Sequence, residues 1–166
     1  MDVRPALRSQ YEAQLAMLME CIRLCPADAW RAGEHPRAFW RIAYHALHFT
    51  HLYLMPTADD FRPWSKAVWH GPILWHDDER GDPPRGGALD PADLLEYAAW
   101  VRSNLREWIE ALDLDSEESG FPWYPVSKLE HQLVNLRHLG THIGQLQERL
   151  YALGLDPRWR GRGETS

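Results

Sequence analysis

The sequence predicts an all-α protein and, within that class, a four-helix bundle with a long crossover connection between helices 2 and 3. Four segments repeat apolar side chains every three or four residues, and no segment alternates with the period of a strand. Residues 56–89, rich in proline and glycine, separate the second helix from the third. A connection of this length can cross the bundle from end to end, so helices 2 and 3 can run parallel.

The first two helices are predicted at residues 5–24 and 36–54. The first has one apolar stripe and stops before Pro26, because proline cannot continue a helix. The second is apolar nearly all round, which predicts a core helix covered by its neighbours. In the connection that follows, Phe61, Trp64 and the apolar residues up to Trp75 are expected to pack on the body, either walling a site or capping the core. Residues 77–87 are expected to be mobile.

The last two helices are predicted at residues 90–112 and 127–153, and both begin with capping residues. Asp90 and Asp93 flank a first-turn proline, and Ser127 with Glu130 forms a capping box. Gly154 is expected to supply a left-handed cap at the end of the fourth helix. We therefore expect a single domain over residues 1–153 and a tail over residues 154–166 that is frayed or contacts a partner.

Composition and charge favour one class of protein and disfavour several others. The 166 residues, 45% apolar and 25% charged, suit one compact soluble domain. A net charge of −6 disfavours nucleic acid as a partner, because phosphates would be repelled. No segment resembles a membrane span or a secretory signal, so we expect a cytoplasmic protein. Cys21 and Cys25 are expected to be reduced and packed in a helix.

Histidines at residues 138 and 142 are the first indication of chemistry. Their spacing of four places both imidazoles on one face of the last helix, one turn apart, where they can share a metal ion. Two ligands are too few, because structural and catalytic zinc sites use at least three protein ligands. A third ligand must therefore come from another helix.

Helix 2 offers three histidines, of which His45 is the best third ligand. At about 100° per residue, His45 lies in the apolar arc of the helix, whereas His48 lies on its flank and His51 farther round. His45 is also near the middle of its helix, at the height of His138 and His142. Among the others, His70 and His76 are expected to be solvated, and His131 to lie about one layer away from the site.

Two tracts resemble the DinB-like (DinB/YfiT-like) superfamily of metalloenzymes. They are Phe39-Trp-Arg-Ile-Ala-Tyr-His45 and Asn135-Leu-Arg-His138-Leu-Gly-Thr-His142-Ile-Gly-Gln145-Leu. The resemblance extends over about residues 5–153 and implies a four-helix bundle with a crossover connection. It also implies a metal held by one histidine of helix 2 and two histidines of a later helix, here His45, His138 and His142. Ile143 departs from the family, where arginine is common.

A three-histidine site leaves room on the ion for water or substrate, as in catalytic sites. Such an ion, for which zinc, nickel and iron are all suitable, can activate water or bind a thiolate. The resemblance favours transfer of a low-molecular-weight thiol to an electrophile. A metal-dependent hydrolase and a non-catalytic, metal-binding helical module that forms a homodimer remain alternatives.

Asn135 and Gln145 are possible supports of the ligands. They lie three residues before His138 and three after His142, on the same side of the helix, where their amides can orient an imidazole. Surface amides are the alternative interpretation of both residues. No carboxylate has a spacing that nominates it as a general base, so the sequence names no catalytic residue.

Overall fold

The computed structural model describes residues 2–32, 37–68, 74 and 87–163. Every regular element in this part of the chain is helical, which confirms the all-α prediction there. The elements, in order, are α1 (Arg4–Leu24), α2 (Ala27–Trp30), α3 (Phe39–Tyr53), the 3-10 helix η1 (Ala58–Asp60), α4 (Pro91–Ala111) and α5 (Lys128–Ala152).

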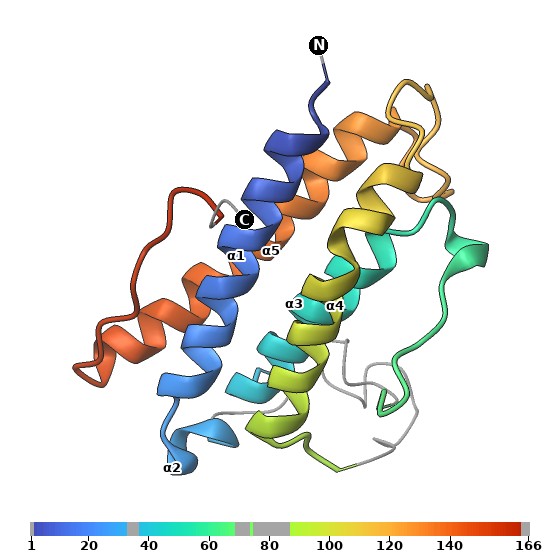
Figure 1. Ribbon diagram of the computed structural model, residues 1–166. Helices are drawn as coiled ribbons and strands as arrows, with labels where there is room; N and C mark the ends of the chain where they lie inside the picture. Colours follow the sequence, from blue (N-terminus) through green and yellow to red (C-terminus); the bar gives the residue numbers. More distant parts are fainter. Residues whose placement is uncertain (1, 33–36, 69–73, 75–86, 164–166) are drawn as a thin grey trace.

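The four long helices lie side by side (Figure 1). α3 packs mainly on α5, and α1 packs on both α4 and α5. In Figure 1, α3 and α4 rise from the lower end of the molecule, whereas α1 and α5 descend. The neighbours α3 and α5 are therefore antiparallel, and this places the middle of one opposite the middle of the other.

The core between these helices is formed by aliphatic and aromatic side chains from all four. Tyr11, Leu47, Leu105 and Leu146 are each at most 1% exposed. Removing such side chains from water is the main stabilising contribution, about 1.5–3 kcal/mol for each large one.

The connection after α3 packs on the body in its first part, as predicted. Trp64 is buried and stacks on Tyr97 of α4, with ring centroids 4.6 Å apart. Trp69, Ile73 and Trp75, and all but the last residue of the segment expected to be mobile, lie outside the described residues.

The helix boundaries follow the capping residues. Asp90 and Asp93 form a reciprocal capping box at α4, and the Ser127 side chain accepts a hydrogen bond from the Glu130 amide at α5. Gly154 has a φ of 75°, the left-handed conformation expected after α5. The prediction was wrong at the start of α3, which begins at Phe39 rather than at residue 36, because Ala38 is extended with a ψ of 150°.

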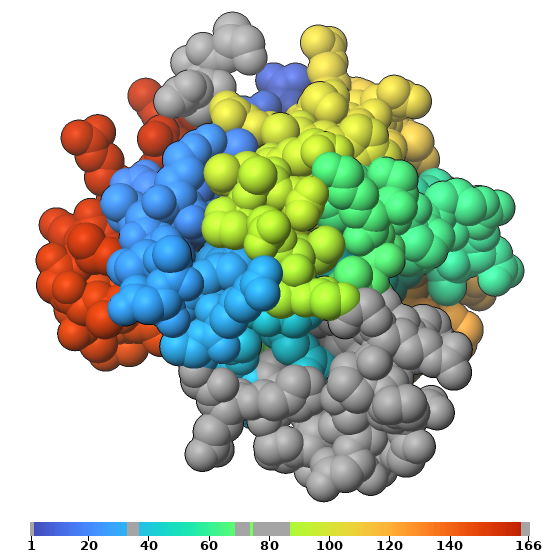
Figure 2. Space-filling model, turned by 90° about the horizontal axis from the view of Figure 1, so that it is seen from below, coloured from blue at the N-terminus to red at the C-terminus, as the bar shows by residue number. Residues whose placement is uncertain are grey.

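At the lower end of the molecule in Figure 1, two side-chain contacts join α2 and the residue after it to the start of α4. The Trp30 indole donates a hydrogen bond to the Leu89 carbonyl over 2.8 Å, and Arg31 pairs with Asp90 over 3.0 Å. Figure 2 shows these two segments side by side, light blue against yellow-green. The apolar periodicity predicted no helix where α2 forms, between the first two predicted helices.

The described part of the C-terminal tail lies along α1, so the expectation that it frays was wrong there. The Arg158 amide donates to the Glu20 carboxylate over 2.9 Å, and the Gly163 amide donates to the Ser9 carbonyl over 2.9 Å. These backbone contacts could not be predicted, because the tail has no periodic pattern. Over the described residues, no helix is both long enough and apolar enough to cross a lipid bilayer.

Candidate metal centre

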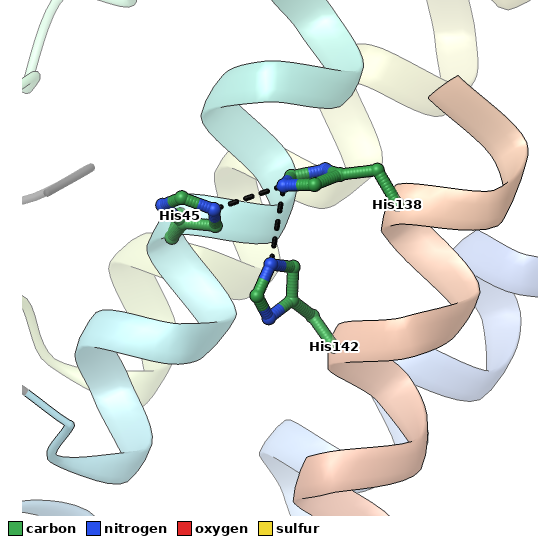
Figure 3. Close-up of side chains that lie close together, drawn as sticks. All are labelled: His45, His138 and His142. Carbon is green, nitrogen blue, oxygen red and sulfur yellow. Dashed lines mark hydrogen bonds between the residues drawn. The ribbon is translucent and has the colours of Figure 1, made fainter. Parts of the chain in front are cut away.

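Three histidine side chains converge between α3 and α5. The Nε2 atom of His138 lies 2.9 Å from Nε2 of His45 and 3.1 Å from Nε2 of His142. Figure 3 shows the three rings pointing toward one another, one from α3 and two from successive turns of α5. One nitrogen of each side chain lies within 4.8 Å of the others, close enough to bind one metal ion.

The positions of the three histidines follow from the two helices that bear them. A spacing of four residues stacks His138 above His142 on the face of α5 that meets α3. His45 lies midway along α3, so the antiparallel packing brings it to the same height. The prediction that His45 joins His138 and His142 in one cluster is confirmed.

The cluster lies at the edge of the core. His142 is only 8% exposed, whereas His45 and His138 are partly exposed. Phe49, one turn after His45, packs against the cluster. The centroid of its ring lies 4.7 Å from that of His45 and 5.5 Å from that of His138. The imidazoles are therefore shielded by an aromatic ring but not sealed from solvent.

The surroundings favour neutral imidazoles. Burial, helped by the charge of His142, lowers the pKa of His138 to about 4. Burial also lowers the pKa of His142; the Gln145 hydrogen bond opposes this effect, and the positive charge of Arg37 adds to it. Neutral imidazole is the form that binds metal ions, so these two rings are in the binding form at neutral pH.

Gln145 lies where it can orient His142. Its Oε1 atom is 2.9 Å from Nδ1 of His142 and accepts a hydrogen bond from that nitrogen. A proton on Nδ1 leaves the lone pair on Nε2, the atom that faces His138. A contact with an imidazole was one of the two interpretations of Gln145 from its spacing, beside that of a surface amide, and its side chain is both exposed and in contact with His142.

Asn135 is buried and makes a different contact from the one considered for it. Its amide donates to the Thr50 carbonyl near the end of α3 over 3.2 Å. Asn135 therefore ties α5 to α3 one turn before His138. Ile143, the departure from the family pattern, is 2% exposed and belongs to the main core.

An open cavity of about 590 Å³ lies beside His142. Its polar wall on α5 contains Thr141, Gln145, Glu148 and Arg149. Ile42 of α3 and Arg37, two residues before that helix, border it from the other side. Arg37, Glu148 and Arg149 were not predicted from the sequence as site residues. The spacing held one usable signal, because Arg149 is seven residues after His142 and so shares its helical face.

The described aromatic residues of the long connections mostly cap the core, which is one of the two alternatives considered for the first part of the connection after α3. Trp64 stacks on Tyr97, and Phe121 packs on Tyr53 and His131. Neither borders the cavity beside His142, although Leu74 of the same long connection does.

The other described histidines are separate from the cluster. His131 is fully buried among aromatic rings, and His48 packs against Phe49 and Phe61. His51 was expected off the core arc but is 2% exposed, because α4 covers that side of α3; its Nδ1 lies 2.9 Å from the Tyr97 hydroxyl. His70 and His76 lie outside the described residues.

Comparisons with family models, with curated proteins and with solved structures find no match to this chain. The chemistry of the site is therefore argued from its own residues. Within the described residues, His45, His138 and His142 are the one group of three potential ligands close enough to hold an ion.

Proposed function

We propose that this chain is a metal-dependent enzyme of the DinB-like type in which His45, His138 and His142 hold a divalent ion. The observation that carries the proposal is the convergence of three Nε2 atoms from two antiparallel helices, at separations of 2.9 and 3.1 Å for two of the pairs. Imidazole nitrogen suits zinc, nickel and iron, so the donor set fits a divalent transition metal.

Two of the three separations between the nitrogens, 2.9 Å for His45–His138 and 3.1 Å for His138–His142, are close to those that a shared ion requires. Two metal–nitrogen bonds of about 2.0–2.1 Å at a tetrahedral angle hold their nitrogens about 3.3 Å apart. These two separations are a few tenths of an ångström shorter, and all three nitrogens lie within 4.8 Å of one another, so rotations of the rings would admit the ion.

We further propose that the fold is a four-helix bundle with residues 54–90 as the crossover between α3 and α4. The parallel course of α3 and α4 supports this assignment, because a short loop would make them antiparallel. The order of elements also agrees with the family resemblance in the sequence.

The proposed reaction is transfer of a low-molecular-weight thiol to an electrophile. A bound ion would favour the thiolate form of such a thiol at neutral pH. The sulfur would form a bond to the electrophilic carbon, the leaving group would depart with the bonding electron pair, and the thiol proton would pass to solvent. In the chain itself, Gln145 orients His142, Phe49 shields the rings, and the cavity beside His142 admits the substrates.

The test uses metal-loaded protein with bacillithiol, mycothiol or glutathione and the chromogenic electrophile 1-chloro-2,4-dinitrobenzene. We expect consumption of one of the thiols above the uncatalysed rate, and its loss in His138→Ala but not in His131→Phe. Hydrolysis of ester substrates without thiol consumption would instead favour the hydrolase. Bound metal without turnover of either kind would favour a non-catalytic module.

A further inference from the structure

The described lining of the cavity beside His142 has a net charge opposite in sign to that of the whole protein. Its described lining includes two guanidinium groups, Arg37 and Arg149, and one carboxylate, Glu148. Two positive charges and one negative charge give a local charge of +1, whereas the chain carries −6. A positive pocket in an acidic protein attracts small anions to that place.

The two arginines are close enough to repel each other. Burial lowers the pKa of Arg149, and the positive charge of Arg37 lowers it further. Within the described part of the chain, neither guanidinium forms an ion pair, whereas Arg31 pairs with Asp90. Guanidinium groups hold carboxylates and phosphates through paired hydrogen bonds, so an anion between them would relieve the repulsion.

The rest of the cavity adds an apolar surface and space. Ile42 and Leu74 border it, and an added Cβ at Gly144 would meet no atom within 4 Å. A volume of about 590 Å³ suits a small molecule rather than a bare ion. His142 contributes to the same wall, so a ligand held by the arginines lies next to the histidine cluster.

We propose that this cavity is a binding site for a small amphipathic anion, whose carboxylate or phosphate contacts Arg37 and Arg149. Its apolar part would lie against Ile42 and Leu74, with the reacting end toward His142. Only the role of that reacting end rests on the proposed function. Binding of the anionic group does not require the metal.

The experiment measures binding to metal-free full-length protein by isothermal titration calorimetry at low ionic strength. The probes are phenylacetate, phenylphosphonate and the uncharged phenylacetamide, which share a ring and differ in charge. We expect the better anion to bind at least about tenfold more tightly than the amide, equivalent to about 1.4 kcal/mol. The stronger of the two anions distinguishes a carboxylate site from a phosphate site.

Charge variants then locate the site. Arg37→Gln, which changes an exposed side chain, should reduce the preference for the anion severalfold, and Arg37→Gln with Arg149→Gln should abolish it. Glu148→Gln should increase the preference for the anion, because it removes the one negative charge of the described lining. Arg106→Gln, an exposed arginine of α4 away from the cavity, is the matched control and should leave it unchanged.

Equal affinity for anion and amide, or a preference that survives loss of both arginines, would overturn the proposal. Metal content, measured on the same variants, separates this result from the proposed function. Variants that keep their metal and lose the anion support both proposals, whereas a wild-type protein that binds the anion but no metal supports the anion site alone.

Discussion

At the scale of single residues, Gln145 is the side chain that most directly controls a histidine of the cluster. Gln145→Leu removes the acceptor for the Nδ1 proton of His142 but keeps a side chain of similar size. We expect metal affinity to fall about 10- to 100-fold, because the imidazole loses its fixed orientation. Competition with a chromogenic chelator measures this change, and unchanged affinity would show that the amide has no such role.

Gly144 permits a test of the open space beside the cluster. A Cβ added at Gly144 of α5 would meet no atom within 4 Å. Gly144→Ala should therefore raise the free energy of unfolding by about 0.5–1 kcal/mol, because alanine has the better helix propensity. Gly154→Ala is the matched control, and it should destabilise because φ is 75° there. Urea denaturation of both variants measures the difference. A destabilised Gly144→Ala would mean that this position is not open.

Residue by residue, sequence reasoning identified the histidines better than their surroundings. Periodicity and height along the helix selected His45, because both quantities depend only on regular helical geometry. Arg37 could not be found in this way, since it precedes α3 and reaches the cavity through the path of the backbone. Asn135 has the expected place on α5, but its partner, the Thr50 carbonyl, depends on how α3 ends.

At the scale of elements, α5 carries a buried histidine that makes stability depend on pH. Burial, helped by the charge of Lys128, lowers the pKa of His131 to about 4. Between about pH 6.5 and pH 4 the unfolded chain binds a proton at this residue that the folded chain does not. The contribution of neutral His131 to stability is therefore fully present above about pH 6.5 and is lost as the pH falls toward 4.

His131→Phe tests this effect, because phenylalanine fits the aromatic surroundings of Tyr53, Phe121 and Tyr124 and does not titrate. The loss of unfolding free energy from pH 7.5 to pH 5.0 should be smaller in the variant than in the wild type by about 2 kcal/mol. Urea denaturation at the two pH values gives both losses. Equal losses would show that His131 is not buried as a neutral ring.

The elements themselves differ in how far sequence predicts them. The long helices were predicted because apolar periodicity and capping residues such as Asp90 and Ser127 act locally. The short helix α2 was missed, since its residues are fixed by a distant contact, the Trp30 hydrogen bond to Leu89. The tail was misjudged for the same reason, because its contacts are with α1.

At the scale of the whole molecule, the proposed ion would link α3 to α5 and so stabilise the folded chain. A ligand that binds only the folded state at about one hundred times its Kd adds about 2.7 kcal/mol. For a domain of this size we expect Tm to rise by about 5–10 °C when zinc or nickel is added to metal-free protein. Thermal denaturation followed by circular dichroism measures the shift.

His45→Ala separates a metal effect from a general salt effect on stability, because the variant keeps both histidines of α5. Its Tm should not respond to the same metal concentration. An equal rise in wild type and variant would show that the ion binds elsewhere. The expectations of a homodimer and of a cytoplasmic protein also concern the whole molecule and stay predictions.

The central claim is that His45, His138 and His142 together hold one divalent ion, and elemental analysis tests it most directly. Wild-type protein purified without added metal should contain close to one equivalent of zinc, nickel or iron. His45→Ala, His138→Ala and His142→Ala should each lose most of it, and His131→Phe, a buried histidine outside the cluster, should retain it. Metal-free wild-type protein that also fails to take up added metal, or metal retained in all three alanine variants, would contradict the claim.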